Sequence, residues 1–246
     1  MTESGNGSSG AVQFRDLTKR FPGQAVAALG GVSGRLEPGE RVALLGANGS
    51  GKTTLLRILA TALAPDGGAA SVAGHDVVRQ RSALRRRLGV LLGSGGGLYK
   101  RLTVRENLSY FARLAAMPAS LESRRIAELA ARFRLEGILD QRVATLSTGM
   151  CQRAALLRAL IHQPDVLLLD EPSTGLDLAA AGALEEMITS VGAGGTTVIL
   201  ASHDIHLVVA TCQRYLLLHE GALIKDDRIT CESDELRRQL LGAILS

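Results

Sequence analysis

The residues best suited to chemistry in this chain form a glycine-rich segment between a predicted apolar strand over 41–45 and a predicted helix that begins near Lys52. Because glycine has no Cβ and tolerates positive φ, such a loop can wrap successive backbone N–H groups around phosphate oxygens. The Lys52 ammonium and the positive end of the helix dipole attract the same anion, and the Thr53 hydroxyl can ligate Mg²⁺. This context predicts a nucleoside triphosphate site made of Gly46, Ala47, Asn48, Gly49, Ser50, Gly51, Lys52, Thr53 and Thr54.

Two adjacent carboxylates follow a second predicted strand. Residues 166–169 are apolar without alternation, which is typical of a parallel strand covered by helices on both faces. Asp170 and Glu171 then emerge at the carboxyl end of that strand, where open α/β sheets bind ligands. Asp170 is predicted to hold Mg²⁺, and Glu171 can accept a proton from an attacking water. A solvated acidic turn before Pro172 is the alternative, and the glycine-rich loop disfavours it.

Two further candidates lie at predicted element ends. Segment 146–150, Leu-Ser-Thr-Gly-Met, precedes a predicted helix running from about Arg153 to Ile161. Ser147 is a favourable N-cap, and a helix start offers unpaired N–H groups to an anion. His203 follows the apolar run 197–201. With His206 it could be a helical metal pair, but zinc needs more ligands and the sequence offers no third.

Five ordered motifs carry a resemblance to a known family. From about Val12 to about Lys225 the chain resembles the ATP-binding cassette (ABC) family. The motifs are the glycine-rich loop, segment 146–150 with Gln152-Arg153 behind it, and segments 170–172, 173–177 and 202–204. The amino-acid sequence of residues 58–65 and 98–108 further resembles the exporter branch typified by sodium-extrusion and daunorubicin-resistance ATP-binding subunits.

The resemblance implies roles for individual residues. In the family, the residues matching Ser147 and Gly149 cap the γ-phosphate of ATP bound by the opposite subunit. The histidine matching His203 hydrogen-bonds the γ-phosphate and orients the water and the carboxylate that matches Glu171. The aspartate matching Asp177 helps couple the two composite sites across the dimer.

The resemblance also implies ligands and partners. An aromatic residue at the position of Phe21 stacks on adenine in the family. Because only 3% of the chain is aromatic, a Phe in the polar stretch 18–23 is less suited to plain core filling. The implied ligands are ATP and Mg²⁺. The implied partners are a separate transmembrane permease subunit and a second nucleotide-binding subunit, in a homodimer or a heterodimer.

One position departs from the family pattern. A Gln that contacts Mg²⁺ and water usually follows the strand predicted over 88–92, and here that position holds Gly93 or Ser94. Because Mg²⁺ readily keeps waters in its shell, one more water could replace the missing side chain. The expected route of coupling to the permease is therefore in question, rather than hydrolysis itself.

The chain organisation predicts a single α/β cassette. Apolar runs alternate with helical segments over 246 residues, enough for one substantial core. The expected fold is a P-loop NTPase core with a mostly parallel sheet, an ABC-type helical subdomain at about 94–151 and a small antiparallel β part. Within that subdomain we expect a Thr103–Glu106 capping box and a helix over 121–133. Ser/Gly-rich residues 1–10 predict a flexible tail, which leaves 11–246 as the nucleotide-binding domain.

Composition limits where in the cell the protein is expected to work. No stretch approaches the roughly 18 uninterrupted apolar residues of a membrane span, and the polar start is unlike a signal peptide. Three widely spaced cysteines favour reduced thiols in the cytoplasm. A net charge of +4 is modest, so no specific nucleic acid is expected, and the arginine cluster at 79–87 is read as a solvated surface. These features predict a cytoplasmic protein, peripheral on the cytoplasmic face of the cell membrane.

Two other functions remain open at this stage. The first is a soluble ABC-type ATPase that acts on nucleic acid or ribosomes, which the modest charge and the single cassette disfavour. The second is a module that closes on ATP without useful hydrolysis, which the missing Gln leaves possible and which Glu171 and His203 disfavour.

Overall fold

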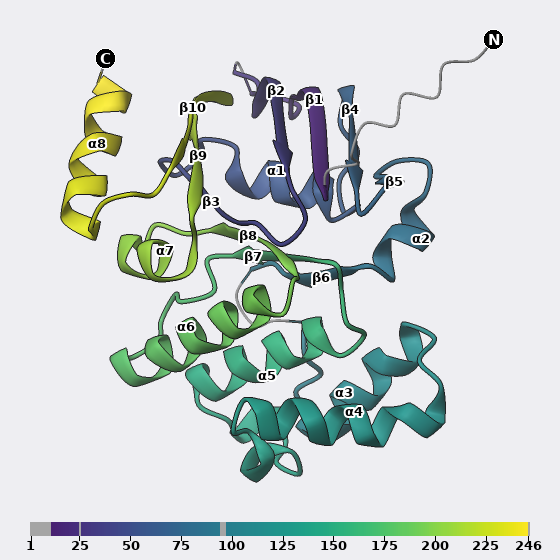
Figure 1. The fold of residues 1–246 in the computed structure, drawn as a ribbon. Helices are drawn as coiled ribbons and strands as arrows, with labels where there is room; N and C mark the ends of the chain where they lie inside the picture. The colour runs from purple at the N-terminus through teal and green to yellow at the C-terminus, as the bar shows by residue number, and fades with distance from the viewer. Residues whose placement is uncertain (1–10, 25, 94–96, 246) are drawn as a thin grey trace.

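Two β-sheets stacked with helices build the molecule (Figure 1). The structure is a computed structural model, and it describes residues 11–24, 26–93 and 97–245. The tail predicted over 1–10 and Ser94 lie outside the described residues.

The larger sheet has six strands and supplies the ends on which the site is built. Its spatial order is β10 (Ala222–Arg228), β9 (Arg214–His219), β3 (Arg41–Leu45), β8 (Thr197–Ala201), β7 (Val166–Asp170) and β6 (Leu88–Leu91). All pairs from β9 to β6 are parallel, and β10 pairs antiparallel with β9. Every residue of β7 and β8 is buried, as their unbroken apolar runs predict.

The smaller sheet is antiparallel. Its order is β2 (Leu29–Leu36), β1 (Val12–Lys19), β4 (Gly67–Val72) and β5 (His75–Asp76). Together the two sheets confirm the predicted α/β class, with a mostly parallel main sheet and a small antiparallel part.

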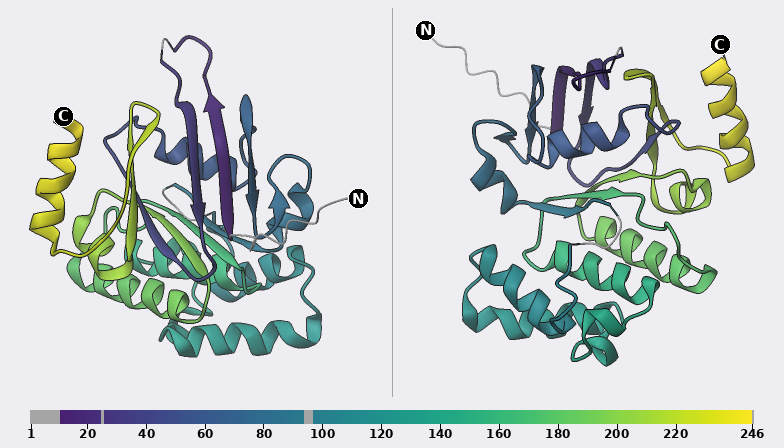
Figure 2. Two further views of the ribbon diagram at one scale, coloured as in Figure 1. Left: turned by 45° about the horizontal axis from the view of Figure 1, so that its top comes forward. Right: turned by 180° about the vertical axis from the view of Figure 1, so that it is seen from behind.

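The helices form layers on both faces of the main sheet. They are α1 (Lys52–Leu59), α2 (Arg81–Arg85), α3 (Val104–Leu114), α4 (Ala119–Arg132), α5 (Thr148–Leu160), α6 (Leu178–Ala193), α7 (Ile205–Thr211) and α8 (Ser233–Leu245), with 3-10 turns η1 (Glu136–Ile138) and η2 (Val143–Thr145). Helix α1 lies between the two sheets, whereas α5 and α6 cover the opposite face and α3 and α4 lie beyond them (Figures 1 and 2).

The sequence patterns of α3 and α4 appear in their geometry. The Thr103 hydroxyl accepts from the Glu106 N–H at 3.1 Å, and the Glu106 carboxylate accepts from the Thr103 N–H at 2.8 Å, so the predicted capping box is confirmed. Helix α4 buries Ile126, Leu129 and Ala130, which are three of the positions that its helical spacing predicts.

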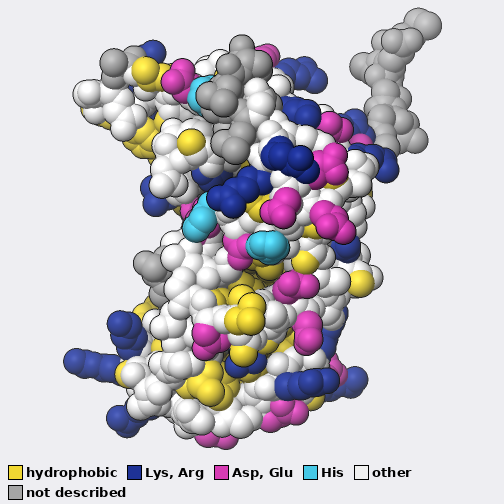
Figure 3. Space-filling view, turned by 90° about the vertical axis from the view of Figure 1, so that its left-hand side faces the viewer, with side chains coloured by type: hydrophobic (Ala, Val, Ile, Leu, Met, Phe, Trp, Pro, Cys, Tyr) yellow, Lys and Arg dark blue, Asp and Glu magenta, His cyan; other side chains and the backbone are white. Residues whose placement is uncertain are grey.

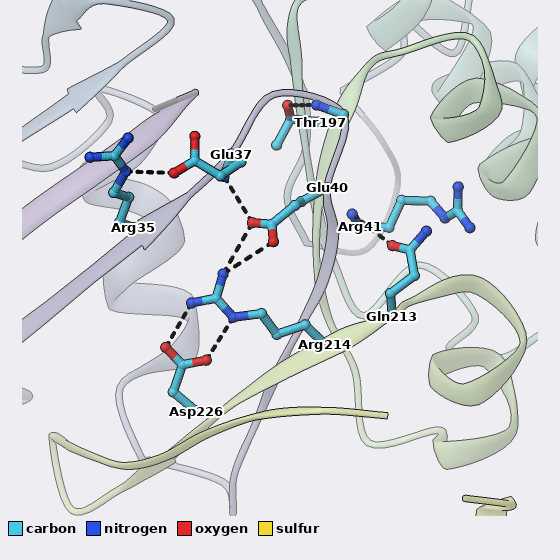
Figure 4. Close-up of polar contacts among 9 residues, drawn as sticks. Arg35, Glu37, Glu40, Arg41, Thr197, Gln213, Arg214 and Asp226 are labelled. Carbon is cyan, nitrogen blue, oxygen red and sulfur yellow. Dashed lines mark hydrogen bonds and ion pairs between the residues drawn. The ribbon is translucent and has the colours of Figure 1, made fainter. Parts of the chain in front are cut away.

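A charged network fixes the amino end of β3 (Figure 4). The Arg214 guanidinium donates to both carboxylate oxygens of Asp226, at 2.6 and 2.7 Å, and to those of Glu40, at 3.1 and 3.3 Å. The Arg41 N–H donates to the Gln213 side chain at 3.0 Å. Because β3 leads directly into the glycine-rich loop, anchoring one end of this strand helps to position the loop at the other.

Among the described residues, none of the helices combines the length and the hydropathy that a bilayer span requires. Cys151, Cys212 and Cys231 are free thiols. Burial raises the pKa of the Cys212 thiol to about 11, so this sulfur is an unreactive part of the core.

Candidate nucleotide-binding and hydrolysis site

The glycine-rich loop has a backbone that only glycine fits at two of its positions. Gly46 has a φ of 146°, and a Cβ there would lie 2.2 Å from the Leu218 carbonyl oxygen. Gly51 has a φ of 108°, and a Cβ there would lie 2.4 Å from the Ala28 carbonyl oxygen. The loop is thus held between β9 and the start of β2, with α1 beginning directly after Gly51. This is the strand, loop and helix order that a phosphate cradle requires.

Lys52 reaches back across the loop. Its ammonium donates to the carbonyl oxygens of Gly46 at 2.7 Å and Ala47 at 2.9 Å. Burial lowers the pKa of Lys52, and the nearby carboxylates of Glu171 and Asp170 oppose that shift. An ammonium has three donors, so a third remains for an anion that the loop holds.

Thr53 and Asp170 form a pair of oxygen ligands. The Thr53 hydroxyl donates to Asp170 Oδ2 at 2.9 Å. Asp170 is 7% exposed, its Oδ1 has no hydrogen-bond partner among the described residues, and burial raises the pKa of this carboxyl. A buried carboxylate oxygen without a partner is costly in a nucleotide-free chain. The hydroxyl and the carboxylate are the hard oxygen donors that Mg²⁺ prefers, so these residues fit that ion.

Glu171 and His203 meet at the ends of two neighbouring strands. His203 Nδ1 lies 2.7 Å from Glu171 Oε2, and the His203 N–H donates to the same oxygen at 3.3 Å. Glu171 has a φ of 51°, a left-handed conformation that costs a non-glycine residue of order 1–3 kcal/mol. The strained backbone and the histidine together fix the direction of this carboxylate.

A cleft of about 260 Å³ brings the first group of predicted residues together. Its lining comprises Phe21, Gln24, Ala28, Asn48, Gly49, Gly51, Lys52, Thr53, Thr54, Asp170 and Glu171. Gly46 and Ala47 contribute their carbonyls to Lys52, and Ser50 is buried behind the loop. The partly buried Phe21 ring is a flat apolar wall at one side, suited to stacking on a nucleobase.

Comparison with known proteins identifies the family. The chain matches the family model described as ABC transporter over residues 29–174. The ABC transporter ATP-binding protein NatA of Bacillus subtilis (strain 168) is 40% identical over 215 residues, which is 87% of each chain. This chain belongs to the ABC transporter family. The daunorubicin resistance ATP-binding protein DrrA3 of Streptomyces coeruleorubidus is 39% identical, over 87% of this chain and 66% of that one.

Solved structures agree with this assignment. An ATP-binding subunit of an ABC transporter superposes with a TM-score of 0.81 and 29% identity, over 96% of this chain and 95% of that one. A cassette solved as a dimer with ADP and Pi has a TM-score of 0.80 at 24% identity, over 90% of this chain and 100% of that one, and shows the shared fold. The chain is therefore an ABC ATPase, the subunit of an ABC transporter that binds and hydrolyses ATP.

The structure places Ser147, Gly149 and Asp177 in a second group, separate from the lining of the cleft. The exposed Ser147 caps α5 by accepting from the Met150 N–H at 3.2 Å. Asp177 caps α6 by accepting from the Ala180 N–H at 2.8 Å. Gly149 is buried against α6, and a Cβ there would lie 2.6 Å from Ala180 Cβ. The two helix starts are therefore packed together, and each has a side-chain cap.

Gly93 is one of the two positions at which the sequence departs from the expected Gln, and the structure adds a restriction there. Gly93 is exposed and has a φ of 75°. Apart from its chain neighbours, no heavy atom of the described residues lies within 4 Å of the point that a Cβ would occupy. A Gln at this position would have room but would adopt a strained left-handed backbone.

Two polar residues that the sequence did not single out hold the chain on either side of Gly93, at Val90 before it and at Tyr99 after it. Asn107 is fully buried and clamps Tyr99, accepting from its N–H at 2.7 Å and donating to its carbonyl at 3.1 Å. Arg158 on α5 donates to the Val90 carbonyl on β6 at 2.5 Å. A buried amide on an amphipathic helix is the one sequence signal that could have indicated the first. The second depends on packing between distant elements.

Proposed function

We propose that this ABC ATPase drives a separate transmembrane permease, and that the assembled transporter is an exporter. Support comes from the curated relatives, which include a daunorubicin resistance ATP-binding protein and a Nod factor export ATP-binding protein that is 38% identical over 88% of this chain. The observation that carries the hydrolysis part of the proposal is the 2.7 Å contact between His203 and Glu171 beside the phosphate cleft. An ATP-binding module without turnover would have no need for a strained, oriented carboxylate at that place.

In the proposed cycle, two nucleotide-binding subunits close on ATP. Lys52 and the loop N–H groups of one subunit hold the phosphates, and Phe21 stacks on adenine. Ser147 and Gly149 of the opposite subunit approach the γ-phosphate at the start of α5, with Asp177 beside them. The packing of α5 on α6 supports this role because it holds both trans-acting segments in one rigid unit.

Hydrolysis is assigned to Glu171 as the general base. His203 holds Oε2, so Oε1 of Glu171 is the oxygen left to accept a proton from water. Thr53 and Asp170 would hold Mg²⁺, which supplies charge compensation for the phosphates when bound.

We further infer that the subunit works on the cytoplasmic face of the cell membrane as a peripheral protein. The proposed cycle hydrolyses cytoplasmic ATP, and three free thiols suit a reducing compartment. In this proposal residues 11–246 act as one nucleotide-binding domain. Its helical subdomain spans about 94–151 and includes α3 and α4.

A soluble ATPase acting on nucleic acid or ribosomes is the competing function. Figure 3 shows basic and acidic side chains interspersed on one face of the molecule, rather than the single-sign surface that a phosphate backbone favours. The discriminating experiment is purification of the tagged protein from gently solubilised native membranes, with mass spectrometry of what co-elutes. A stoichiometric multi-span protein supports the exporter proposal. Ribosomal or nucleic-acid partners without a membrane protein would overturn it.

The catalytic assignment has its own test. Glu171→Gln should bind ATP normally but lose turnover by about 10²–10⁴-fold, because the amide cannot accept the proton of water. ATP should then hold the variant as a dimer in size-exclusion chromatography. Glu136→Gln, which changes an exposed carboxylate in η1, is the matched control and should behave as wild type. Equal turnover in both variants would exclude Glu171 as the base.

A further inference from the structure

A second hollow lies where α4, α5 and α6 meet, outside the nucleotide cleft. Its volume is about 350 Å³, within the range of small-molecule sites. Three arginines line it, Arg132 and Arg134 at the end of α4 and Arg153 on α5. Cationic side chains from two helices thus converge on one cavity of the size of a small ligand.

Arg153 is the strongest indication of a ligand. Its Nε is buried and has no hydrogen-bond partner among the described residues. The guanidinium also forms no ion pair with any carboxylate in the described part of the chain. A buried N–H without an acceptor costs free energy that a bound anion would recover.

Arg132 is held in a fixed orientation beside it. Its Nη2 donates to the Ser190 carbonyl at 2.7 Å and to the Ser190 hydroxyl at 2.8 Å, and its Cζ lies 5.2 Å from the centroid of the Phe133 ring. The second terminal nitrogen, Nη1, forms no hydrogen bond with the described residues. A guanidinium that is already ordered loses little further entropy when it binds an oxyanion.

Arg134 adds a third cation at an unusual backbone position. It is exposed and lies two residues beyond the end of α4, after the C-cap Phe133, with a φ of 54°, where glycine or asparagine is the preferred residue. An arginine here keeps a positive charge at the rim of the hollow in spite of a strained backbone.

The hollow contains little negative charge to balance its arginines. Glu186 on α6 is the one carboxylate among its lining residues, and it forms no ion pair of 4.0 Å or less with the described residues. Three guanidinium groups against one carboxylate leave an excess of positive charge inside a partly enclosed space, which favours an anion.

We propose that this hollow is a binding site for a tetrahedral oxyanion, either inorganic phosphate or the phosphate group of a small phosphomonoester. Planar guanidinium forks match phosphate oxygens, and one of the three, that of Arg132, is already held beside the cavity by Ser190. The anion would join the end of α4 to α5, which begins at Ser147, and to α6, which begins after Asp177. Its occupancy would thereby regulate how firmly the helical layer is attached to the ATPase core.

The test must separate this site from the phosphate loop, which also binds phosphate. The full-length protein is therefore studied in a Lys52→Ala background, which weakens the loop site. Thermal unfolding and calorimetric titration with sodium phosphate are compared with sodium chloride at equal ionic strength. The expected result is saturable binding and a rise in Tm that Lys52→Ala retains. Adding Arg153→Gln should weaken the binding about tenfold or more, as loss of a hydrogen bond to a charged group predicts.

Three further variants are expected to weaken phosphate binding, to tighten it and to leave it unchanged. Arg134→Gly should raise Tm without phosphate, because it relieves the left-handed strain, and yet it should weaken phosphate binding. Glu186→Gln should tighten binding, because it removes the repelling charge. Arg142→Gln, at an exposed arginine outside the hollow, is the matched control and should leave binding unchanged.

The probe identifies the source of the anion. Glycerol 3-phosphate that binds more tightly than inorganic phosphate would indicate a phosphomonoester, and the reverse order would indicate free phosphate. Loss of all binding in Lys52→Ala, or equal binding in the Arg153→Gln and Arg142→Gln proteins, would overturn the proposal. Stabilisation that never saturates would also overturn it, since that behaviour reflects general exclusion of the salt from the protein surface.

Discussion

Replacing Gly149 with alanine tests how the two trans-acting segments are held. The added Cβ would lie 2.6 Å from Ala180 Cβ, whereas carbon atoms ordinarily stay about 3.5–4.0 Å apart, so the starts of α5 and α6 must separate by about 1 Å. Overpacking of this kind costs about 1–3 kcal/mol, and the better helix propensity of alanine returns about 1 kcal/mol. We expect a net loss of about 0–2 kcal/mol, which lowers Tm by at most about 8 °C in a chain of 246 residues.

The same displacement should impair ATP turnover, because a 1 Å misplacement can cost about 10²-fold. Ala180→Gly removes the clashing atom, after which the nearest neighbours of the new Cβ are Leu176 Cδ2 at 3.8 Å and the Ala180 Cα position at 3.9 Å. Thermal unfolding and turnover are therefore measured for both single variants and for the double variant. The double variant should be more stable than the sum of the single effects predicts. A double variant whose losses are purely additive would refute the packing argument.

Other variants test the proposed Mg²⁺ ligand Asp170, the loop at Gly93 and the hydrogen bonds between Asn107 and Tyr99. Asp170→Asn should raise the Tm of the nucleotide-free protein at neutral pH, since burial raises the pKa of Asp170 and disfavours its charged form. The gain over wild type should shrink as the pH falls and wild type takes up a proton, and an unchanged gain in a pH series of melts would contradict this. Gly93→Gln should cost about 1–3 kcal/mol in urea unfolding because of its φ of 75°, and it should alter partner-stimulated hydrolysis or its magnesium dependence if this loop senses the metal. Asn107→Ala leaves the Tyr99 N–H and carbonyl without their buried partner and should lower stability in urea by about 2–4 kcal/mol, and a loss below 1 kcal/mol would indicate that water replaces the amide.

The sequence was most informative where the chemistry is local. The glycine-rich loop between β3 and α1 requires residues with special φ values and no Cβ, and those requirements leave a direct trace in the residue types. The same is true of the buried runs β7 and β8, whose lack of alternation predicts a central parallel strand. The position of Asp170 and Glu171 then follows from the rule that ligands bind at the carboxyl ends of such strands.

Contacts between distant elements could not be predicted in this way. The family resemblance gives Gly149 a role toward a partner subunit, but the close approach of Ala180, which also requires a glycine there, depends on how α5 packs against α6. Likewise, Arg158 reaches Val90 across the layer between helix and sheet, at a sequence separation of 68 residues. Such pairs combine residues of ordinary type at no fixed spacing, so no local pattern identifies them.

The contact between His203 and Glu171 constrains the chemistry more than either residue does alone. An ionised carboxylate only accepts hydrogen bonds, so the 2.7 Å contact places a proton on His203 Nδ1. A neutral imidazole in that tautomer presents Nε2 as an acceptor, which cannot donate to a phosphate oxygen. The two roles that the family resemblance gives to this histidine, orienting Glu171 and donating to the γ-phosphate, therefore require both ring nitrogens to be protonated at once.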